Sequence, residues 1–163
     1  FAAWNIAQAN EKAANRQFLG LISEQSFYNL LTRQVELEVV PACRDYGVGL
    51  ICYSPLAGGA LAGNIYKSES GRRSTLNLDE SRVNQLKKFE TLCSRLGESM
   101  STIALAWLLK NPVVTAPIIG PRTVEQLETT VRAVEIDLDT ETMSEIDRIF
   151  PGPGGEAPEA YAW

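Results

Sequence analysis

The sequence predicts an α/β fold built on a parallel sheet. Three short apolar segments alternate with helical segments along 163 residues, and this order is typical of parallel strands joined by right-handed helical crossovers. Polar or aromatic residues come at the end of each apolar segment, where ligands of parallel sheets collect. The pattern fits either a small open sheet or part of a (β/α)8 barrel, since a whole barrel needs about 250 residues.

The first part of the chain predicts a helix followed by a strand. Residues 2–17 are rich in Ala, Gln, Glu and Lys and place apolar side chains on one face, as an amphipathic helix does. The run FLGLISEQ, residues 18–25, predicts a short strand. Residues 26–33 predict the loop that follows this strand.

A second helix and a second strand come next. Residues 36–46 predict a helix that ends at Gly47, because glycine suits the left-handed position after a helix. Pro41 lies inside this range, and its missing N–H fits either the first turn or a kink. Residues 48–53 form an apolar run that predicts a buried strand.

Two helices separate the second strand from the third. The polar stretch 68–77 predicts a loop. Apolar residues then recur every three to four positions over residues 79–96, which predicts an amphipathic helix that stops at Gly97. Residues 101–110 are apolar on nearly every side, which predicts a buried helix.

The last part of the chain repeats the order of strand and helix. Residues 113–119 are apolar and predict the third strand. Thr123 and Gln126 have the spacing of a capping box, so a helix is predicted over residues 123–134. A final helix is predicted over residues 140–150.

The composition is that of an ordinary globular chain with a net charge of −5. Net negative charge disfavours nucleic acid and anionic membranes as partners, and no apolar run approaches the roughly 20 residues that span a bilayer.

The chain has no histidine and three widely spaced cysteines. These features predict no metal site and free thiols in a reducing cytoplasm. We expect residues 1–150 to form one domain and residues 151–163, rich in Pro and Gly, a tail.

The loop after the second strand predicts part of a site for an anionic ligand. Tyr53 offers a flat stacking face, and Ser54 adds a hydroxyl. Gly58 and Gly59 let backbone N–H groups approach an anion closely. Gln25 ends the first predicted strand and would reach the same rim. Each residue taken alone also fits a purely structural role, as a core aromatic, a strand-end amide or a plain connector.

The segment after the third strand predicts a second part of the same site. Gly120 and Arg122 precede the helix that begins at Thr123. A helix N-terminus favours negative charge, and the planar guanidinium of arginine binds phosphate bidentately. An ordinary turn with a solvated arginine is the alternative. The two parts make one site only if they share a rim of the sheet.

Three segments resemble the C-terminal half of aldo-keto reductases. They are EQSFYNLLTRQVELEVVPACRDYGVGLICYSPLAGGALAGN, IALAWLLKNPVVTAPIIGPRTVEQL and the terminal APEAYAW. The chain is most similar to aryl-alcohol-dehydrogenase-like reductases and potassium-channel β-subunits. The resemblance implies a (β/α)8 TIM barrel that binds NADP(H), with this chain supplying strands 6, 7 and 8 and their helices. It implies a cytoplasmic oxidoreductase that reduces aldehydes or ketones to alcohols.

The resemblance also implies roles for single residues. Gln25 matches the glutamine that hydrogen-bonds the nicotinamide carboxamide, and Tyr53 matches the aromatic residue that stacks on the nicotinamide ring. Arg72 is a candidate for a phosphate contact, because Asn64 stands where relatives often carry lysine. The other implied contacts are with the pyrophosphate, from Ser54, Pro55, Leu56, Ala57 and Gly58, and with the 2′-phosphate end of the adenosine, from Gly120, Arg122 and Gln126.

The resemblance implies no catalytic residue in this chain, because the family's catalytic Tyr, Asp, Lys and His belong to its N-terminal half. Two functions stay open. The chain is either the cofactor-binding half of an NADPH-dependent reductase of small carbonyl compounds, or a non-catalytic NADP(H)-binding or half-barrel interaction module. Free sheet edges near Leu21 and Thr115 predict pairing with a missing N-terminal half or with further copies of the chain.

Overall fold

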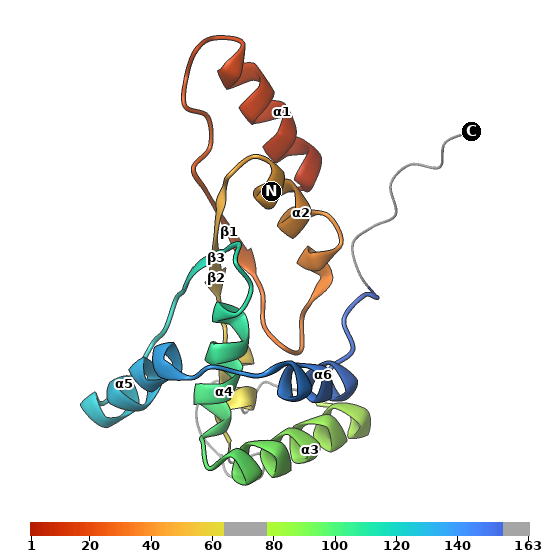
Figure 1. The fold of residues 1–163 in the computed structure, drawn as a ribbon, viewed down its shortest axis with the longest axis vertical. Helices are drawn as coiled ribbons and strands as arrows, with labels where there is room; N and C mark the ends of the chain where they lie inside the picture. Colours follow the sequence, from red (N-terminus) through yellow and green to blue (C-terminus); the bar gives the residue numbers. More distant parts are fainter. Residues whose placement is uncertain (64–77, 155–163) are drawn as a thin grey trace.

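Three short strands form one parallel sheet in the computed structural model, which describes residues 1–63 and 78–154 (Figure 1). The strands are β1 (Ser23–Phe27), β2 (Gly49–Tyr53) and β3 (Val114–Pro117), and they lie side by side in that order. β2 pairs in parallel with both neighbours. Each connection must therefore cross from one end of the sheet to the other, and helices make these crossings. The predicted α/β class with a parallel sheet is confirmed.

The first strand lies further along the chain than predicted. Residues 18–22 are outside β1, whereas Ser26 and Phe27, which were expected in the loop, belong to it. Gly20 explains the late start, because its φ of +74° is incompatible with an extended strand. The third strand is shorter than predicted and ends at Pro117, although the N–H of Ile118 still donates to the Cys52 carbonyl (2.7 Å).

The predicted helices are present, with ends that differ by a few residues. Helix 123–134 was expected as one element, but it is an α-helix followed by a 3-10 turn. The described helices are α1 (Ala3–Ala14), α2 (Val39–Asp45), α3 (Glu80–Leu96), α4 (Met100–Leu109), α5 (Val124–Val131) and α6 (Thr140–Ile149), and the short 3-10 segments are η1 (Gln34–Glu36), η2 (Ala57–Ala62) and η4 (Arg132–Glu135).

Side-chain caps determine where several of these helices begin. The Asp79 carboxylate accepts from the N–H of Arg82 at the start of α3, and the Ser99 hydroxyl accepts from that of Thr102 at the start of α4. Asp139 caps α6 in the same way. These bonds satisfy backbone donors that have no partner inside the helix, so a polar residue before each periodic segment was a usable signal.

The second helix begins later than predicted, and this settles the position of Pro41. α2 starts at Val39, so Pro41 lies in its first turn, where a missing N–H costs no helical hydrogen bond. Glu36 belongs instead to η1. Gly47 follows the helix with φ +66° and lets the N–H of Val48 donate back to the Cys43 carbonyl (2.8 Å).

The helices cover one face of the sheet. Leu50 and Cys52 point to this face and are fully buried, and α2 and α4 contact β2 and β3 there. α4 is apolar all round and is buried along almost its whole length, as predicted. On the opposite face, Gln25 and Tyr53 are exposed. Within the described residues, this second face of the sheet is open.

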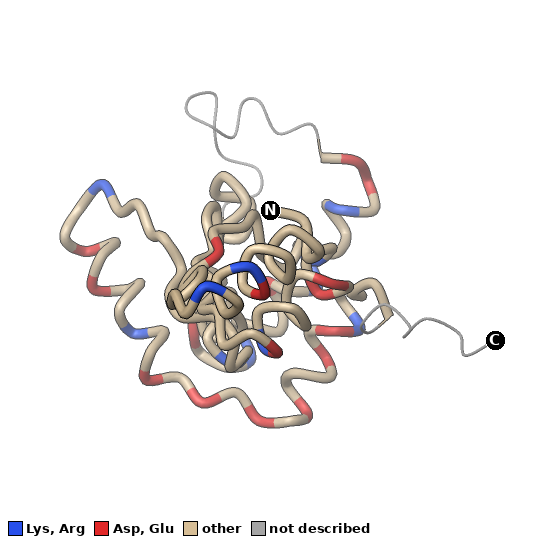
Figure 2. The backbone as a smooth tube through the Cα atoms, turned by 90° about the horizontal axis from the view of Figure 1, so that it is seen from above, with Lys and Arg blue, Asp and Glu red and all other residues tan. Residues whose placement is uncertain are grey.

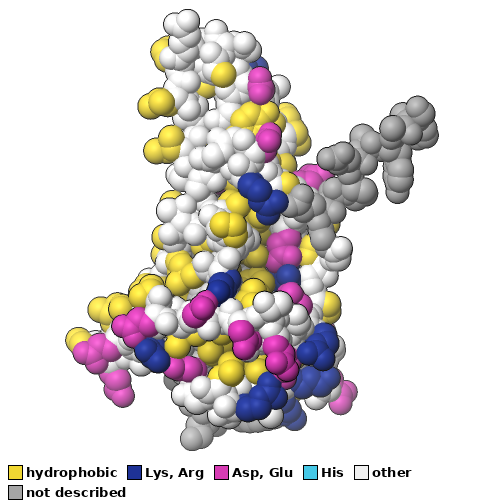
Figure 3. Space-filling view, in the orientation of Figure 1, with side chains coloured by type: hydrophobic (Ala, Val, Ile, Leu, Met, Phe, Trp, Pro, Cys, Tyr) yellow, Lys and Arg dark blue, Asp and Glu magenta, His cyan; other side chains and the backbone are white. Residues whose placement is uncertain are grey.

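Exposed apolar side chains gather in two further places. One is the segment between α1 and β1, where Phe18, Leu19 and Ile22 are largely exposed. The other is α5, seen at the lower left of Figure 3. The α5 stripe repeats at helical spacing and comprises Val124, Leu127 and Val131, continued by Val134 in η4. A stripe of this kind is typical of a helix face that packs against another element.

Candidate functional site

The ends of the three strands lie at one edge of the sheet. The register pairs Phe27 with Tyr53, and it pairs Cys52 with Pro117. The segments after β2 and β3 therefore leave from the same end of the sheet, which Figure 1 shows below the strands. In parallel sheets this carboxyl edge is where ligands bind. The structure thus brings Tyr53 and the starts of both predicted loops to a shared edge.

An aromatic pair marks this edge on the open face. The rings of Phe27 and Tyr53 stack with centroids 5.3 Å apart and planes 25° apart. Both side chains remain partly accessible, at 39% and 44% of their full exposure. Phe27 was missed because it was placed in a loop. The signal that could have found it is its two-residue spacing from Gln25, which is the period of a strand face.

Gln25 lies on the same open face but not at the end of its strand. It was predicted as the last residue of a strand over residues 18–25, whereas it is the central residue of β1. It pairs in register with Ile51, two residues before Tyr53 in β2. Since alternate residues of a strand share a face, Gln25 and Tyr53 point to the same side of the sheet.

The loop after β2 is held in an unusual backbone conformation. Ser54 has φ +50° and Ala57 has φ +49°, although neither is glycine. Gly58 and Gly59 follow with φ +63° and +100°. Left-handed non-glycine residues cost roughly 1–3 kcal/mol each, so the surrounding contacts must fix them. The Ser54 carbonyl accepts from the N–H of Ala57 (3.0 Å), which closes the turn.

Within this loop, the buried residues and the exposed residues have different roles. Pro55 and Ala57 are buried and Leu56 is half-buried, so their side chains anchor the loop to the protein. Ser54 and Gly58 are exposed and present the loop to solvent. η2 continues from here and contacts α4. The loop is therefore a rigid turn whose outer surface is available to a ligand.

Asn29 is a second residue that the sequence analysis missed. It is fully buried, and its Nδ2 donates to the Ser54 carbonyl (3.0 Å) across 25 positions of sequence. Its Oδ1 accepts from the N–H of Leu31 (3.0 Å). An asparagine next to a strand end is a common turn residue, and nothing in its local sequence indicates the long-range bond.

The loop after β3 is fully exposed and partly bonded to itself. The Thr123 hydroxyl accepts from the N–H of Gln126 (3.2 Å), as the capping box predicts. The return bond differs, because Gln126 Oε1 accepts from the N–H of Arg122 (2.8 Å) and not from that of Thr123. The Arg122 guanidinium makes no hydrogen bond or ion pair with any residue that the structure describes. It is thus available to an anion, beside exposed Gly120.

Burial makes the thiol of Cys52 unreactive at neutral pH. Cys52 precedes Tyr53 on the covered face, and burial raises the pKa of its thiol to about 12. A protonated, inaccessible thiol is neither a nucleophile nor a metal ligand. The predicted free state of the three cysteines is confirmed, and all three are buried.

Three predictions concern Arg72, metal binding and membrane spanning. Arg72 lies within residues 64–77, which the structure does not describe, so its phosphate contact stays a prediction. In residues 1–63 and 78–154, no three His, Cys, Asp or Glu side chains are grouped to hold a metal ion. Over the same ranges, no helix has both the length and the apolar character needed to cross a bilayer. Lys and Arg lie among Asp and Glu along the described trace (Figure 2).

A pocket of about 260 Å³ lies away from the strand ends, between the β1–α2 connection and helices α4 and α6. Arg33, Trp107 and Asp147 are among its lining residues, and none of the predicted cofactor residues is. The candidate site, where Tyr53, Ser54 and Gly58 are exposed, is an open edge of the sheet.

Comparison with known proteins gives consistent matches along the chain. A profile of the aldo/keto reductase family matches residues 1–150. An uncharacterized oxidoreductase of Bacillus subtilis (strain 168) is 54% identical over 165 residues, covering 100% of this chain and 51% of that protein. Versiconal hemiacetal acetate reductase of Aspergillus parasiticus is 31% identical over 158 residues, covering 91% and 46%. A provisionally named voltage-gated potassium channel subunit beta of Schizosaccharomyces pombe is 33% identical over 165 residues, covering 92% and 48%. The chain spans about half the length of these relatives.

Proposed function

Because the chain belongs to the aldo/keto reductase family, we propose that it holds the cofactor of an NADPH-dependent reductase of aldehydes and ketones. The cofactor supplies hydride chemistry when it is bound, and the protein supplies binding and orientation. The observation that carries the proposal is the shared edge of the sheet. There, Tyr53 and the loop that leads to Arg122 follow strands that end side by side.

The open face of the sheet is the proposed seat of the nicotinamide. Tyr53 would stack on the ring, with Phe27 supporting it from the neighbouring strand at 5.3 Å. Gln25 points to the same face, and its amide can both donate to and accept from a carboxamide. These residues would fix which face of the nicotinamide meets the carbonyl carbon of a small substrate.

The two loops are the proposed seat of the phosphates. The turn from Ser54 to Gly58, including Pro55, Leu56 and Ala57, would carry the pyrophosphate on its exposed surface. The guanidinium of Arg122, which has no partner among the described residues, suits a 2′-phosphate, with Gly120 allowing close approach and Gln126 holding the Arg122 backbone. Arg72 is proposed as a further phosphate contact, and it lies outside the described residues.

The sheet fits the C-terminal half of a (β/α)8 barrel, with β1, β2 and β3 as strands 6, 7 and 8. Three observations support this proposal. In the part of the chain that the structure describes, helices cover one face only, and the outer edges of β1 and β3 have no partner strand; the chain also spans about half the length of its relatives. The open face would then line the barrel interior, and an N-terminal half would supply the proton donor. Pairing with further copies of the chain is the alternative. We place the reductase in the cytoplasm.

Cofactor titration tests the proposal. Fluorescence titration of the chain with NADPH should give binding that Tyr53→Ala weakens by about 1–2 kcal/mol through lost stacking. Arg122→Ala should weaken NADPH far more than NADH, because only NADPH carries the 2′-phosphate. Arg148→Ala is the matched control, since among the described residues exposed Arg148 donates only to the Ser144 carbonyl of its own helix. Equal losses for both cofactors in Arg122→Ala would contradict the phosphate assignment. NADPH binding without turnover after an N-terminal half is added would favour the non-catalytic module.

A further inference from the structure

The structure assigns Asn29 as a positioning residue: we propose that its side chain holds Ser54 in the left-handed conformation that shapes the cofactor loop. This inference rests on the proposed cofactor site and deepens it. Asn29 is fully buried and lies in the connection after β1, whereas Ser54 lies in the loop after β2. Their bond (Nδ2 to carbonyl oxygen, 3.0 Å) ties the connections after two neighbouring strands together.

Both polar atoms of the Asn29 amide are hydrogen-bonded, so its orientation is determined. Oδ1 accepts from the N–H of Leu31 (3.0 Å), which leaves only Nδ2 to face the Ser54 carbonyl. The Asn29 backbone also pairs with Thr32 in both directions (3.2 and 3.0 Å). A buried amide is costly unless it is bonded, so alternative arrangements that break these bonds are disfavoured.

Ser54 needs such a partner because its backbone is strained. With φ +50° it lies in a region that non-glycine residues adopt only when their surroundings hold them there. Its carbonyl receives two donors, the N–H of Ala57 and Nδ2 of Asn29. A rotation about Ser54 would move the exposed backbone of Gly58 relative to Tyr53. The Asn29 bond therefore sets the geometry between the proposed stacking residue and the proposed phosphate turn.

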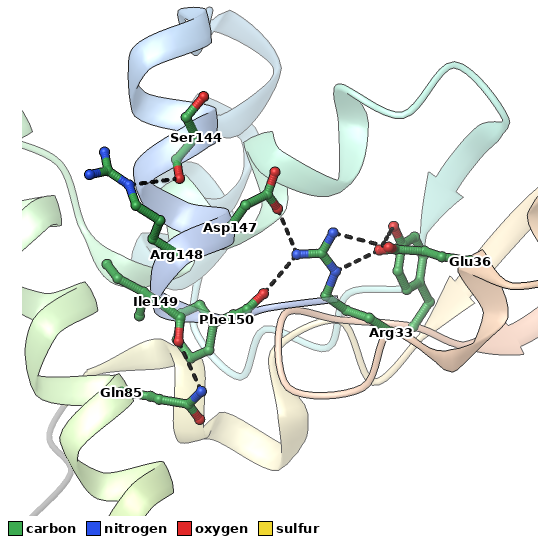
Figure 4. Close-up of polar contacts among 9 residues, drawn as sticks. Arg33, Glu36, Gln85, Ser144, Asp147, Arg148, Ile149 and Phe150 are labelled. Atoms are coloured by element: carbon green, nitrogen blue, oxygen red, sulfur yellow. Dashed lines mark hydrogen bonds and ion pairs between the residues drawn. The ribbon is translucent and has the colours of Figure 1, made fainter. Parts of the chain in front are cut away.

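Asn29 has a well-defined position because contacts with other elements hold its neighbours Tyr28 and Arg33 in place. Tyr28 is buried edge-on against Trp107 of α4, with ring centroids 5.4 Å apart, and its hydroxyl donates to Glu36 (2.8 Å). Arg33 donates to both carboxylate oxygens of Glu36 and to the Phe150 carbonyl at the end of α6 (Figure 4). The segment that carries Asn29 is thus attached to α4 before Asn29 and to the end of α6 after it.

One substitution removes the donor to Ser54 and keeps the acceptor for Leu31. Asn29→Asp keeps an acceptor for Leu31 but replaces the donor to Ser54 with an oxygen that repels the carbonyl. Asn10→Asp is the matched control, because Asn10 makes the same two kinds of bond, donating to the Ile6 carbonyl (2.9 Å) and accepting from the N–H of Leu21 (3.0 Å). Asn10 ties α1 to the segment before β1, away from the strand ends. Asn29→Ser is a milder second variant that removes the reach to Ser54 without adding charge.

Amide hydrogen exchange of the full chain tests the inference, with NADPH titration alongside. In Asn29→Ser and Asn29→Asp, the N–H of Ala57 should exchange at least about fivefold faster, as expected for the loss of one hydrogen bond. Core amides such as that of Leu108 should accelerate much less than Ala57, whereas general destabilisation alone would accelerate both equally. NADPH affinity should fall by roughly tenfold, because a displaced turn weakens the stacking and phosphate contacts without removing either of them. Asn10→Asp should change neither Ala57 exchange nor affinity.

The two proposals fail separately. Unchanged Ala57 exchange in both Asn29 variants, or equal acceleration of Ala57 and Leu108, would overturn the positioning role of Asn29. Local acceleration at Ala57 with unchanged NADPH affinity would also overturn it, because the loop would then move without consequence for the cofactor. Absence of NADPH binding by the unmodified chain would count against the proposed function instead, and the exchange data would still decide whether Asn29 controls Ser54.

Discussion

Arg33→Met should destabilise the fold severely, because the Arg33 guanidinium joins distant parts of the chain. It donates to Glu36 Oε1 and Oε2 (2.7 and 3.0 Å), to Asp147 (2.6 Å) and to the Phe150 carbonyl (2.7 Å). Its carbon Cζ also lies 5.0 Å from the centroid of the Trp107 ring. Burial alone would lower the pKa of Arg33, but the hydrogen bonds to Glu36 and Asp147 outweigh it and raise the pKa. The side chain is therefore charged at every usable pH.

The expected loss is about 3–4 kcal/mol of the free energy of unfolding. The Arg33 and Glu36 side chains are only 14% and 18% exposed, and removing one partner of such a pair costs about 3 kcal/mol because the other charge stays desolvated. The Asp147 contact adds less than about 1 kcal/mol, since Asp147 is 51% exposed. Losing the donor to the Phe150 carbonyl accounts for the remainder. Domains of this size are stable by about 5–15 kcal/mol, so the change is a large fraction.

Urea unfolding followed by circular dichroism measures this loss. Arg148→Met is the matched control, because it removes an arginine of α6 that donates to the Ser144 carbonyl of its own helix (Figure 4) and has no other partner in residues 1–63 and 78–154. The control should change the free energy of unfolding by less than about 0.5 kcal/mol. A loss below about 1 kcal/mol for Arg33→Met, or equal losses for both variants, would refute the reasoning.

Four further predictions have defined outcomes. Burial raises the pKa of Cys52 and Cys93 to about 12, so a thiol reagent at about pH 8 should label the folded chain far more slowly than the urea-unfolded chain; comparable rates would contradict this. Because these folded pKa values lie above the unfolded value of about 8.5, the unfolded chain loses protons first, and the urea midpoint should fall as pH rises past about 9; a constant midpoint would exclude this linkage. Ser99→Ala should cost about 1 kcal/mol by removing the cap of α4, whereas Ser99→Asp should cost little, as urea unfolding would show. Gly58→Ala should cost about 1–2 kcal/mol in the same assay because φ is +63°.

Local patterns predicted the elements of this fold well where periodicity is strong. The buried helix α4 and the strand β2 follow directly from apolar composition, and the cap at Thr123 follows from its spacing to Gln126. The boundaries of β1 were wrong because apolar residues 18–22 look like a strand, whereas the left-handed backbone of Gly20 keeps them out of it. A propensity pattern contains no information about that dihedral angle.

Long-range polar contacts could not be predicted in this way. Asn29 reaches Ser54 across 25 positions, and Arg33 reaches Phe150 across 117. Such contacts depend on how the elements pack, and packing has no sequence period. The stacked partner of Tyr53 was missed for a related reason, because Phe27 gains its role only once β1 and β2 are in register. The binding roles of Gln25, Tyr53 and Arg122 stay predictions, and NADPH titration of the Tyr53 and Arg122 variants tests two of them.

Because helices cover one face of the sheet, each strand carries two sets of residues with different constraints: one set must pack, and the other can contact a ligand. In β2, Leu50 and Cys52 pack under the helices, while Ile51 and Tyr53 alternate with them on the open face. Substitutions at the strand ends of the open face can therefore change ligand preference without disturbing the core under the helices. A combinatorial library limited to Phe27 and Tyr53 would vary binding at little cost in foldability, and the same separation would let natural variants diverge in specificity while they keep one scaffold.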